Sequence, residues 1–370
     1  MAKIVVLGLA TSLVNYRGVM LQAMIKHGHS VVGCAPNANS EIQDTLAKMG
    51  VEYKNIPLNS TGLNPLQDIK AIYAMITLLK KEKPDIVLSY TIKLVLFGSF
   101  AAWFTKVPGI FSMITGLGYA FTGRDLKRRI VAAIIRSLCR TCIRINKKVF
   151  FQNPDDLKFF EYAGFLKEPE QAILINGSGV DLDYFCPELL PESISFIMIA
   201  RLIKDKGVIE YIEAARLIKR QYPHILFRLA GLIDKNPASI TKEQLNVWIE
   251  EGIIDYLGWL NDVRPAIAAS SVFVFPSYRE GMPRGVLEAM SMGRPIITTD
   301  VPGCRETVIN GVNGFLVPAQ NILSLAFAMQ YFINDSNLVS IMGKQSRLIA
   351  IDKFDVNKVN NVILKTLCLV

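Results

Sequence analysis

The chain has 370 residues, 51% of them hydrophobic and 20% charged, which is enough apolar material for two buried α/β domains and excludes a disordered chain. Lys and Arg number 41 against 32 Asp and Glu, so the formal net charge is +9. No run of about 18 uncharged apolar residues occurs, the best candidate being 94–104, and the first residues form an apolar strand without a signal peptide's cleavage pattern. We therefore expect a cytoplasmic protein without a membrane-spanning helix.

Apolar runs and helical patterns alternate in the first half of the chain. The expected strands are 3–7, 30–35, 52–56 and 86–89. The helices expected between them are 18–27, 40–49 and 66–81. Such alternation is typical of a doubly wound parallel sheet.

The same alternation returns after a break at 176–191, where Gly, Asp and Pro accumulate without periodicity, as in a hinge. A helix is expected at 208–220, among strands at 195–200, 226–230, 254–257, 272–276, 295–299 and 314–317. We predict an α/β fold with two Rossmann-like, doubly wound domains, 1–175 and 176–350, that face each other across a cleft. An apolar helix in 351–370 is expected to pack back on the first domain.

Metal and redox chemistry are not favoured. Of six scattered cysteines only Cys139 and Cys142 are close in sequence, and no further His or Cys completes a zinc site. Asp181 and Asp183 form an Asp-x-Asp pair that a metal could bind, but they lie in the expected hinge. The first loop lacks Gly-x-Gly-x-x-Gly, which disfavours a nicotinamide dehydrogenase. We expect reduced cysteines and no metal site.

Basic residues concentrate in 123–148, where they interleave with apolar residues at helical spacing. Such a segment can lie on an anionic membrane, and we favour this interpretation. The alternative is a solvated helix whose apolar stripe packs inward. Nucleic acid is not an expected partner, because neither an aromatic stacking platform nor a nucleic-acid motif accompanies the charge.

Two glutamates, Glu280 and Glu288, follow the expected strand 272–276. Pro283 suits the first turn of a helix, so Glu280 is expected in the loop and Glu288 near the helix start. A helix N-terminus favours phosphate, and a nearby carboxylate accepts hydrogen bonds from vicinal hydroxyls such as those of ribose. We assign this role to Glu288, and assign Glu280 to a sugar hydroxyl or to positive charge at an anomeric carbon. The alternative is a surface helix with salt bridges.

A second loop supplies two cations, Arg201 and Lys206, after the expected strand 195–200. Arg offers a planar fork to phosphate oxygens and Lys a mobile point charge, so together they would stabilise a departing nucleoside diphosphate without a metal. A solvated basic turn is the alternative. Ligands of open α/β sheets bind beyond the carboxyl ends of the strands, so we expect both loops to serve one ligand.

Three segments resemble the retaining nucleotide-sugar glycosyltransferases of family 4, which have the two-domain GT-B fold. They are ARLIKDKG, EGMPRGVLEAMSMGRPIITTDVPGCRETV and NGVNGFLV. The resemblance covers nearly the whole chain and implies an acceptor-binding N-terminal domain, a UDP-sugar-binding C-terminal domain and no required metal or other cofactor. It implies catalytic roles for Glu280, Arg201 and Lys206, with both cations on the diphosphate, Glu280 near the donor sugar and Glu288 on the ribose.

The donor site implied by the resemblance extends beyond these charged groups. Backbone groups of 256–260 are expected to hold the base, and the first loop is expected to approach the donor phosphate. The expected donor-binding residues are Asn15, Arg17, Arg201, Lys206, Leu257, Gly258, Glu280, Gly281, Met282, Pro283, Arg284, Gly285, Val286, Leu287 and Glu288.

More narrowly, SYTIK (89–93), ITGLGYAFTG (114–123) and DVPGCRETV (300–308) resemble a subgroup that builds bacterial surface polysaccharides or lipid-linked oligosaccharides. Members include α-1,3-N-acetylgalactosaminyltransferases acting on undecaprenyl-diphosphate sugars. The resemblance implies transfer of a hexose or N-acetylhexosamine, with GalNAc in an α-1,3 linkage as the first choice. It also implies work at the inner face of the cytoplasmic membrane, where 123–148 would meet anionic lipids.

The acceptor is expected near loops that follow two strands of the first domain. The expected acceptor residues are Thr91, Lys93, Thr115, Gly116, Leu117 and Gly118. The chain departs from the family in one respect: many members have a histidine in the N-terminal cleft, but none of His27, His29 and His224 is well placed for that role. The alternatives to a transferase are a nucleotide-sugar epimerase of the same architecture and a non-catalytic subunit of a polysaccharide-assembly complex.

Overall fold

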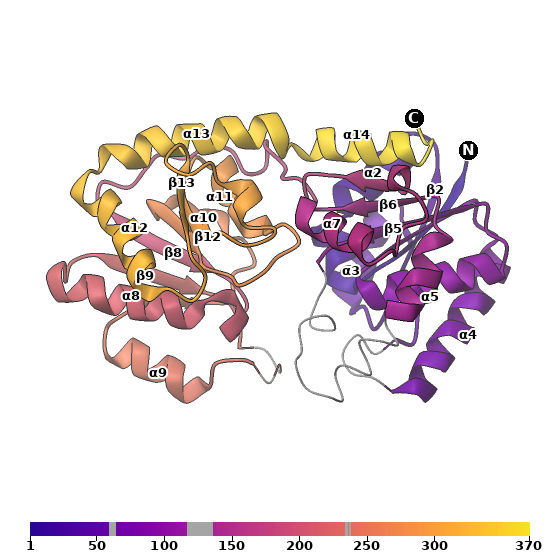
Figure 1. The fold of residues 1–370 in the computed structure, drawn as a ribbon, viewed down its shortest axis with the longest axis horizontal. Coiled ribbons are helices and arrows are strands. Elements are labelled where there is room, and N and C mark those ends of the chain that lie inside the picture. The colour runs from indigo at the N-terminus through magenta and orange to yellow at the C-terminus, as the bar shows by residue number, and fades with distance from the viewer. Residues whose placement is uncertain (59–63, 117–135, 234–235, 237) are drawn as a thin grey trace. The chain divides into compact units, whose positions relative to one another are not determined.

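The computed structural model describes residues 1–58, 64–116, 136–233, 236 and 238–370 (Figure 1). It contains two compact units, which we call unit 1 and unit 2. Unit 1 comprises Met1–Ser178 and Asn357–Val370, and unit 2 comprises Gly179–Val356. The sequence prediction has the corresponding boundaries at 175/176 and 350/351, so the first crossing lies inside the Gly-rich segment expected as a hinge.

Unit 1 is built on a seven-stranded sheet in which every neighbouring pair is parallel. The strands are β1 (Lys3–Leu7), β2 (Ser30–Ala35), β3 (Glu52–Asn55), β4 (Ile86–Tyr90), β5 (Gly109–Ile114), β6 (Lys148–Phe151) and β7 (Ala172–Leu174). Their spatial order is β3-β2-β1-β4-β5-β6-β7, so the order reverses between β1 and β4. Central strands read as continuous apolar runs because helices cover both faces of the sheet.

The labelled helices of unit 1 pack around this sheet. They are α1 (Ala10–Asn15), α2 (Gly18–Lys26), α3 (Ser40–Lys48), α4 (Pro65–Glu82), α5 (Ile92–Phe104), α7 (Pro154–Tyr162) and α14 (Val356–Thr366). Asn39, Asn64 and Asn153 precede α3, α4 and α7, and each side chain accepts a hydrogen bond from a backbone N–H of the first turn. These caps fix where the helices begin.

Two helices of unit 1 show how apolar sequence is used. The 94–104 run, which was the best membrane-span candidate, lies in the mostly buried helix α5. Among the described residues no helix is long and apolar enough to cross a bilayer. The C-terminal helix α14 inserts Ile363 and Leu364 into the same core cluster as β1 and β4, and His29 Nε2 lies 2.9 Å from the carbonyl oxygen of Leu369. That contact gives His29 a structural role.

Unit 2 repeats the plan with six parallel strands in the order β10-β9-β8-β11-β12-β13. The strands are β8 (Ser195–Ile199), β9 (Leu226–Ala230), β10 (Asp255–Gly258), β11 (Val272–Phe275), β12 (Ile296–Thr299) and β13 (Gly314–Val317). The helices are α8 (Val208–Gln221), α9 (Lys242–Glu250), α10 (Arg264–Ala268), α11 (Arg284–Ser291), α12 (Ile322–Asn334) and α13 (Asn337–Lys353). Successive residues of β8 point to opposite faces of the sheet. Phe196 and Met198 join one core cluster, and Ile197 joins another.

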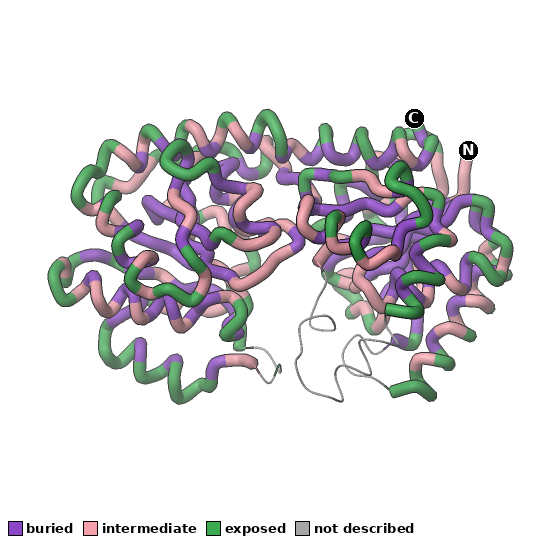
Figure 2. The backbone as a smooth tube through the Cα atoms, in the orientation of Figure 1, coloured by how far each residue is buried: buried purple, intermediate pink, exposed green. Residues whose placement is uncertain are grey.

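Figure 2 shows buried strands inside each unit and exposed outer faces on its helices. The predicted α/β fold with two doubly wound sheets is confirmed.

The described part of the basic segment is helical over residues 136–144. Its apolar side faces inward, where Cys139, Cys142 and Ile143 join a core cluster of unit 1. Burial raises the pKa of the Cys139 thiol to about 12 and that of Cys142 to about 11, so both stay protonated at neutral pH. This part of the segment therefore follows the alternative of an inward-packed helix, while 123–135 lies outside the described residues. The described residues contain no group of three or more His, Cys, Asp or Glu that could hold a metal ion.

Candidate active site

The order of strands in unit 2 reverses between β8 and β11, and these two strands pair directly through Phe196 with Val272 and Ile197 with Phe273. Loops that leave the carboxyl ends of the strands at such a reversal form the usual ligand crevice of a doubly wound sheet. The loop after β8 carries Arg201 and Lys206 and the loop after β11 carries Glu280. Topology thus brings the two predicted loops to one place.

A glycine lets the two loops approach each other. The turn η3 (Lys204–Lys206) ends at Gly207, which has a left-handed φ of 75°. A Cβ atom there would lie 2.1 Å from the carbonyl oxygen of Pro276, so glycine is required by both conformation and space. The carbonyl oxygen of Asp205 accepts a hydrogen bond from Tyr278 N at 2.9 Å and lies 3.2 Å from Ser277 Oγ. The loops are therefore bound to each other along their backbones.

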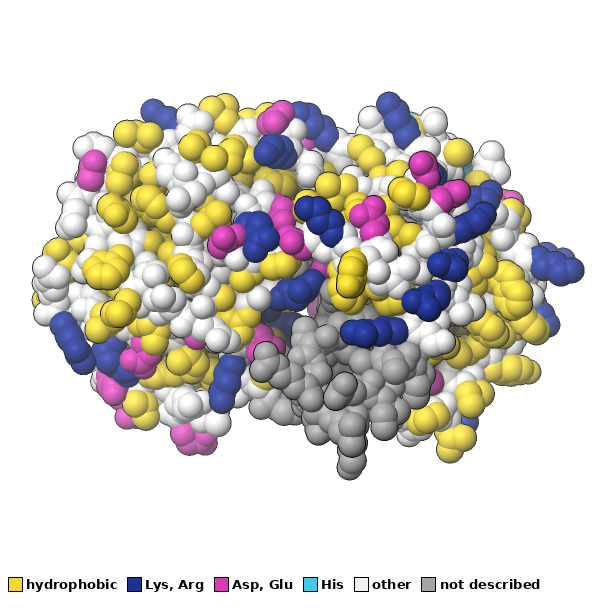
Figure 3. All heavy atoms as spheres, viewed as in Figure 1, with side chains coloured by type: hydrophobic (Ala, Val, Ile, Leu, Met, Phe, Trp, Pro, Cys, Tyr) yellow, Lys and Arg dark blue, Asp and Glu magenta, His cyan; other side chains and the backbone are white. Residues whose placement is uncertain are grey.

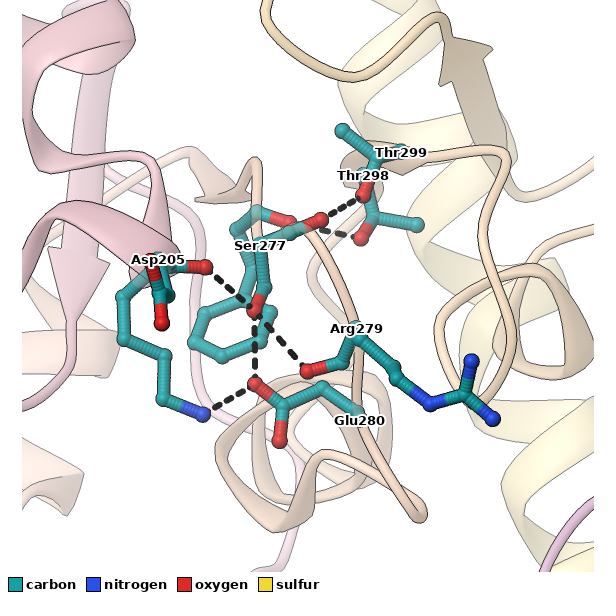
Figure 4. A network of polar contacts seen from close by, with 8 residues as sticks. Asp205, Ser277, Arg279, Glu280, Thr298 and Thr299 are labelled. Atoms are coloured by element: carbon teal, nitrogen blue, oxygen red, sulfur yellow. Dashed lines mark hydrogen bonds and ion pairs between the residues drawn. The ribbon is translucent and has the colours of Figure 1, made fainter. Parts of the chain in front are cut away.

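Lys206 and Glu280 meet where the loops join. Lys206 Nζ donates to Glu280 Oε1, and Ser277 Oγ lies 2.8 Å from the same carboxylate oxygen (Figure 4). Both charged side chains are mostly buried, and Lys206 Nζ also lies 5.7 Å from the centroid of the Phe275 ring. In this setting a charge pair is screened less by solvent than on an open surface. The arrangement holds a cation and a carboxylate side by side at the switch point of the sheet.

The loop after β12 supports Glu280 from a third direction. Glu280 N donates to the carbonyl oxygen of Pro302 at 3.0 Å, and Thr299 Oγ1 donates to that of Ser277 (Figure 4). Gly303 has φ 83°, and a Cβ there would lie 2.4 Å from the carbonyl oxygen of Glu280. The backbone that carries the carboxylate is therefore fixed on both sides.

Glu288 lies in α11, whose N-cap is Pro283. Arg284 Nε donates to Glu288 Oε1 at 2.8 Å, an ion pair with the i,i+4 spacing of a helix. Burial raises the pKa of the Glu288 carboxyl above its ordinary value, and the charge of Arg284 opposes that shift. A carboxylate that burial destabilises is a common feature of functional sites.

The other predicted donor residues divide by burial. The side chains of Val286 and Leu287 belong to the core, and both backbone N–H groups donate to the carbonyl oxygen of Pro283. These two residues thus shape the start of α11 and do not present side chains to a ligand. Arg201 is exposed, and Leu257 and Gly258 end the edge strand β10. Gly281, Met282 and Gly285 lie beside the two glutamates in sequence, buried or half-buried.

In unit 1 the predicted residues also follow strands at its reversal. Asn15 is exposed, whereas Arg17 is buried with its guanidinium carbon 5.3 Å from the centroid of the Tyr90 ring, a position that does not favour direct contact with a donor. Thr91 has a left-handed φ of 69° at the start of α5, and Lys93 Nζ pairs with Asp68 Oδ1 of α4 at 2.6 Å. Thr115 and Gly116 are half-buried after β5, while Leu117 and Gly118 lie outside the described residues.

Unit 1 also contains a hollow of about 900 Å³ at the carboxyl ends of β1, β2 and β3. Its lining mixes apolar with polar residues, and the polar ones are Thr11, Asn37, Asn39, Gln67 and Lys70. The hollow does not contain Thr91 or Lys93, although Asp68, the partner of Lys93, lies between two of its lining residues in α4. No motif in the sequence marks this hollow, because its lining residues are spread over three loops and the first turns of α1, α3 and α4.

Sequence reasoning also missed the supports of Glu280. Ser277 and Thr299 contribute hydroxyl groups, and Gly303 permits the close approach of the loop after β12. A partial signal was present, because the segments 272–276 and 295–299 are both expected strands of the second domain. What the sequence lacked was a reason to pair Ser277 with the nearby carboxylate of Glu280, or Thr299 with Ser277, which is 22 residues away.

Comparisons with known proteins identify the family of the chain. The family model described as Glycosyl transferase 4-like matches residues 3–153, and that described as Glycosyl transferases group 1 matches residues 193–335. Among curated proteins, the N,N'-diacetylbacillosaminyl-diphospho-undecaprenol alpha-1,3-N-acetylgalactosaminyltransferase of Campylobacter jejuni is 27% identical over 96% of this chain and 95% of its own. The UDP-Gal:alpha-D-GlcNAc-diphosphoundecaprenol alpha-1,3-galactosyltransferase of Escherichia coli is 27% identical over 82% of this chain and 80% of its own.

Solved structures place the fold. The Anabaena protein HepE in complex with UDP and glucose matches with a TM-score of 0.78 and 17% identity, covering 100% of both chains. Two parallel, doubly wound sheets and family models over both halves of the chain lead to one assignment. The chain is a glycosyltransferase and belongs to the family-4 glycosyltransferases with the GT-B fold.

Proposed function

We propose that the chain transfers a hexose or N-acetylhexosamine, with GalNAc in an α-1,3 linkage as the first choice, from a UDP-sugar to an undecaprenyl-diphosphate-linked saccharide. The product would serve bacterial surface polysaccharide or related glycan synthesis. The single observation that carries the proposal is the contact of Lys206 with Glu280 between the two loops at the β8–β11 reversal. The names of the Campylobacter and Escherichia relatives support the acceptor class, and UDP in the HepE complex supports the donor class.

The charged groups suit a departing diphosphate beside a sugar. Lys206 and Arg201 would compensate the charge of the UDP leaving group, because ammonium and guanidinium groups bind phosphate oxygens strongly in a partly dry site. Glu280 would stabilise positive charge that develops at the anomeric carbon, and Glu288 would accept hydrogen bonds from the ribose hydroxyls. UDP-sugar is the donor substrate, and we propose no metal or further cofactor.

We propose that transfer retains the anomeric configuration. The acceptor oxygen forms its bond to the anomeric carbon on the face from which the bond to the diphosphate oxygen breaks. The proton of the acceptor hydroxyl passes to that diphosphate oxygen, so UDP leaves and no protein base is needed. Lys206 lies against Glu280 already, so the positive group near the leaving oxygen is positioned before the reaction begins.

The acceptor's saccharide would bind unit 1. The hollow at the carboxyl ends of β1, β2 and β3 offers amide and hydroxyl groups. Such groups are better suited to bind sugar hydroxyls than to bind a phosphate group. Among the described residues that line it, Lys70 is the one cation, and it would face the acceptor's diphosphate. Because such an acceptor resides in a bilayer, we also propose peripheral association with the inner face of the cytoplasmic membrane, and 123–148 remains a candidate for contact with anionic lipids.

The proposal is tested by a panel of UDP-sugars incubated with synthetic prenyl-diphosphate saccharides, followed by NMR of the product's anomeric carbon. The expected result is a new α linkage formed from UDP-GalNAc, with weaker or no transfer from the other donors. An inverted configuration would overturn the retaining mechanism. Conversion of a UDP-sugar in the absence of acceptor, without transfer in its presence, would replace the transferase with an epimerase.

A further inference from the structure

Helix α4 exposes large apolar side chains along one face. Leu66, Ile69 and Tyr73 follow the i, i+3, i+7 spacing and are 74%, 63% and 72% exposed. The same helix buries Ala71 and Met75 in the core on its other side. The apolar face is therefore not needed to attach α4 to its sheet.

Two aromatic side chains at the end of α5 extend this face. Trp103 and Phe104 are 54% and 53% exposed, and α4 packs against α5. Lys80, which lies on the same side of α4 as Tyr73, has its Nζ 5.7 Å from the centroid of the Phe104 ring. Figure 3 shows hydrophobic side chains gathered at the place that α4 occupies in Figure 1. The α4–α5 surface comprises Leu66, Ile69, Lys70, Tyr73, Lys80, Lys81, Trp103, Phe104 and Lys106.

The exposed charges of the α4–α5 surface are all positive, namely Lys70, Lys80, Lys81 and Lys106. The two acids of α4 are paired with lysines outside this surface: Asp68 Oδ1 lies 2.6 Å from Lys93 Nζ, and Glu82 Oε2 lies 2.7 Å from Lys3 Nζ. Helix α5 contains no acidic residue. The surface therefore combines aromatic and aliphatic side chains with four exposed lysines.

We propose that the α4–α5 surface docks unit 1 on the anionic face of a lipid bilayer. Aromatic rings settle at the level of the lipid headgroups, aliphatic side chains enter the acyl boundary, and lysines attract anionic headgroups. The inference rests on the proposed function, because an enzyme whose acceptor is anchored in a bilayer has to reach that bilayer. It adds to that function the part of the molecule that makes the contact.

The position of the hollow in unit 1 supports contact of the α4–α5 surface with the bilayer. Gln67 and Lys70, from the first turns of α4, line the hollow, while Leu66 and Ile69 of the same turns belong to the exposed face. If the saccharide of a lipid-linked acceptor lies in the hollow, its lipid chain emerges next to α4, the helix proposed to contact the bilayer. Charge complementarity and this continuity favour a lipid surface over a second copy of the chain, which carries the same positive charge.

Helix α12 of unit 2 offers a matched control. Leu323 and Phe327 are each 61% exposed, so the apolar exposure resembles that of Ile69 and Tyr73. The sequence of α12 contains no charged residue. If exposed apolar side chains alone caused binding to vesicles, both helices would contribute to it equally.

The test measures flotation of the full chain with vesicles of phosphatidylglycerol mixed with phosphatidylethanolamine, and with vesicles of phosphatidylcholine alone. We expect the wild type to bind the anionic vesicles and to bind phosphatidylcholine weakly. Lys80→Gln with Lys81→Gln should lower the partition coefficient about fivefold per lysine. Ile69→Ser with Tyr73→Ser should lower it about tenfold or more, and Leu323→Ser with Phe327→Ser should leave it unchanged. Wild-type binding by both α4 variants, or equal loss in the α12 variant, would overturn the proposal.

Two further measurements separate this inference from the proposed function and from self-association. With a short-chain, water-soluble prenyl-diphosphate saccharide, the α4 variants should keep wild-type transfer, and with the same acceptor chemistry embedded in anionic vesicles they should lose it. Vesicle binding that depends on α4 in a protein without any transfer would support docking while the proposed function fails. A changed oligomeric state of Ile69→Ser with Tyr73→Ser in light scattering, with unchanged vesicle binding, would show that the surface joins two copies and would overturn docking.

Discussion

The two units place different chemistry at equivalent edges of their sheets. At the β8–β11 reversal of unit 2, Lys206 and Glu280 join two loops that are also bound through Asp205. At the β1–β4 reversal of unit 1, Arg17 is buried beside Tyr90, and Lys93 is paired with Asp68. The comparison shows that two sheets of the same topology carry different loop residues at their reversals, so we expect them to bind different ligands.

The most damaging change to the charged edge of unit 2 should be Glu280→Gln. It keeps the size of the side chain but removes the charge opposite Lys206 and next to the proposed anomeric centre. We expect turnover to fall about 100-fold or more, with a much smaller change in the donor dissociation constant, because the charge acts mainly in the transition state. Steady-state kinetics and donor titration measure the two effects.

Glu213→Gln is the matched control, since Glu213 also forms an ion pair, with Arg216, but on the exposed side of α8. It should leave turnover unchanged. Equal turnover of the Glu280→Gln enzyme and the wild type would show that Glu280 has no part in the mechanism. The sheet edge of unit 2 would then not differ from that of unit 1 in the way proposed.

Gly207→Ala should separate the two loops of unit 2. Its Cβ would lie 2.1 Å from the carbonyl oxygen of Pro276 at a residue with φ 75°, so we expect a loss of about 2–4 kcal/mol in the free energy of unfolding and a large loss of turnover. Gly252→Ala measures only the cost of a left-handed backbone conformation, because Gly252 has φ 67° and no atom lies within 4 Å of its Cβ position. That control should cost only about 1–2 kcal/mol. Equal losses in thermal unfolding would show that the contact with Pro276 is unimportant.

Ser277→Ala should weaken the positioning of Glu280. The hydroxyl lies within 3.5 Å of Asp205 O, Arg279 O and Glu280 Oε1, and its one proton favours the charged acceptor. Loss of a hydrogen bond to a charged group should lower turnover about tenfold with little change in donor affinity. Ser271→Ala removes a buried hydroxyl that donates to Ser193 O at 3.1 Å, so it should cost similar stability and leave turnover intact. Matching kinetics for the two variants would argue against a positioning role.

Glu288→Gln should have a smaller effect, and its effect on the free energy of unfolding should depend on pH. Burial raises the pKa of this carboxyl, so its contribution to folding is most favourable below the unfolded value near 4.5 and is lost as pH rises through the folded pKa. The Gln variant should therefore gain stability relative to wild type as pH rises, while its affinity for UDP falls about tenfold. Denaturant unfolding at several pH values measures the first effect and calorimetry the second.

Glu82→Gln provides the opposite sign. The hydrogen bond from Lys3 lowers the pKa of Glu82, so this carboxylate stabilises the fold above its unfolded pKa and that contribution is lost as pH falls through the folded pKa. The Gln variant should lose stability relative to wild type at neutral pH. If both variants changed with pH in the same direction, the assignment of burial as the cause at Glu288 would be wrong.

The sequence was sufficient for the fold class because strand and helix periods alternate through both halves, but β5, β6 and β7 of unit 1 were not among the expected strands. It also pointed to Lys206 and Glu280 in the loops after β8 and β11, and their ligand-binding roles stay a prediction. The approach of Arg17 to a donor phosphate stays a prediction, and the structure shows this residue buried with its guanidinium over the Tyr90 ring.

Other features could not be read from the chain because they depend on contacts between distant segments. The support of Glu280 by Pro302 and Thr299 requires that β12 pair with β11, and the exposed face of α4 requires knowledge of which side its sheet covers. Helical spacing alone assigns Leu66, Ile69 and Tyr73 to an apolar stripe, and such stripes normally face the core.

A crystal structure of the protein with UDP bound tests most directly whether the loops after β8 and β11 bind one nucleotide. We predict that one UDP molecule has its diphosphate within hydrogen-bond distance of Lys206 Nζ and its ribose hydroxyls within that distance of Glu288. UDP bound with Lys206 and Glu288 on separate ligands, or with neither residue in contact, would contradict the account.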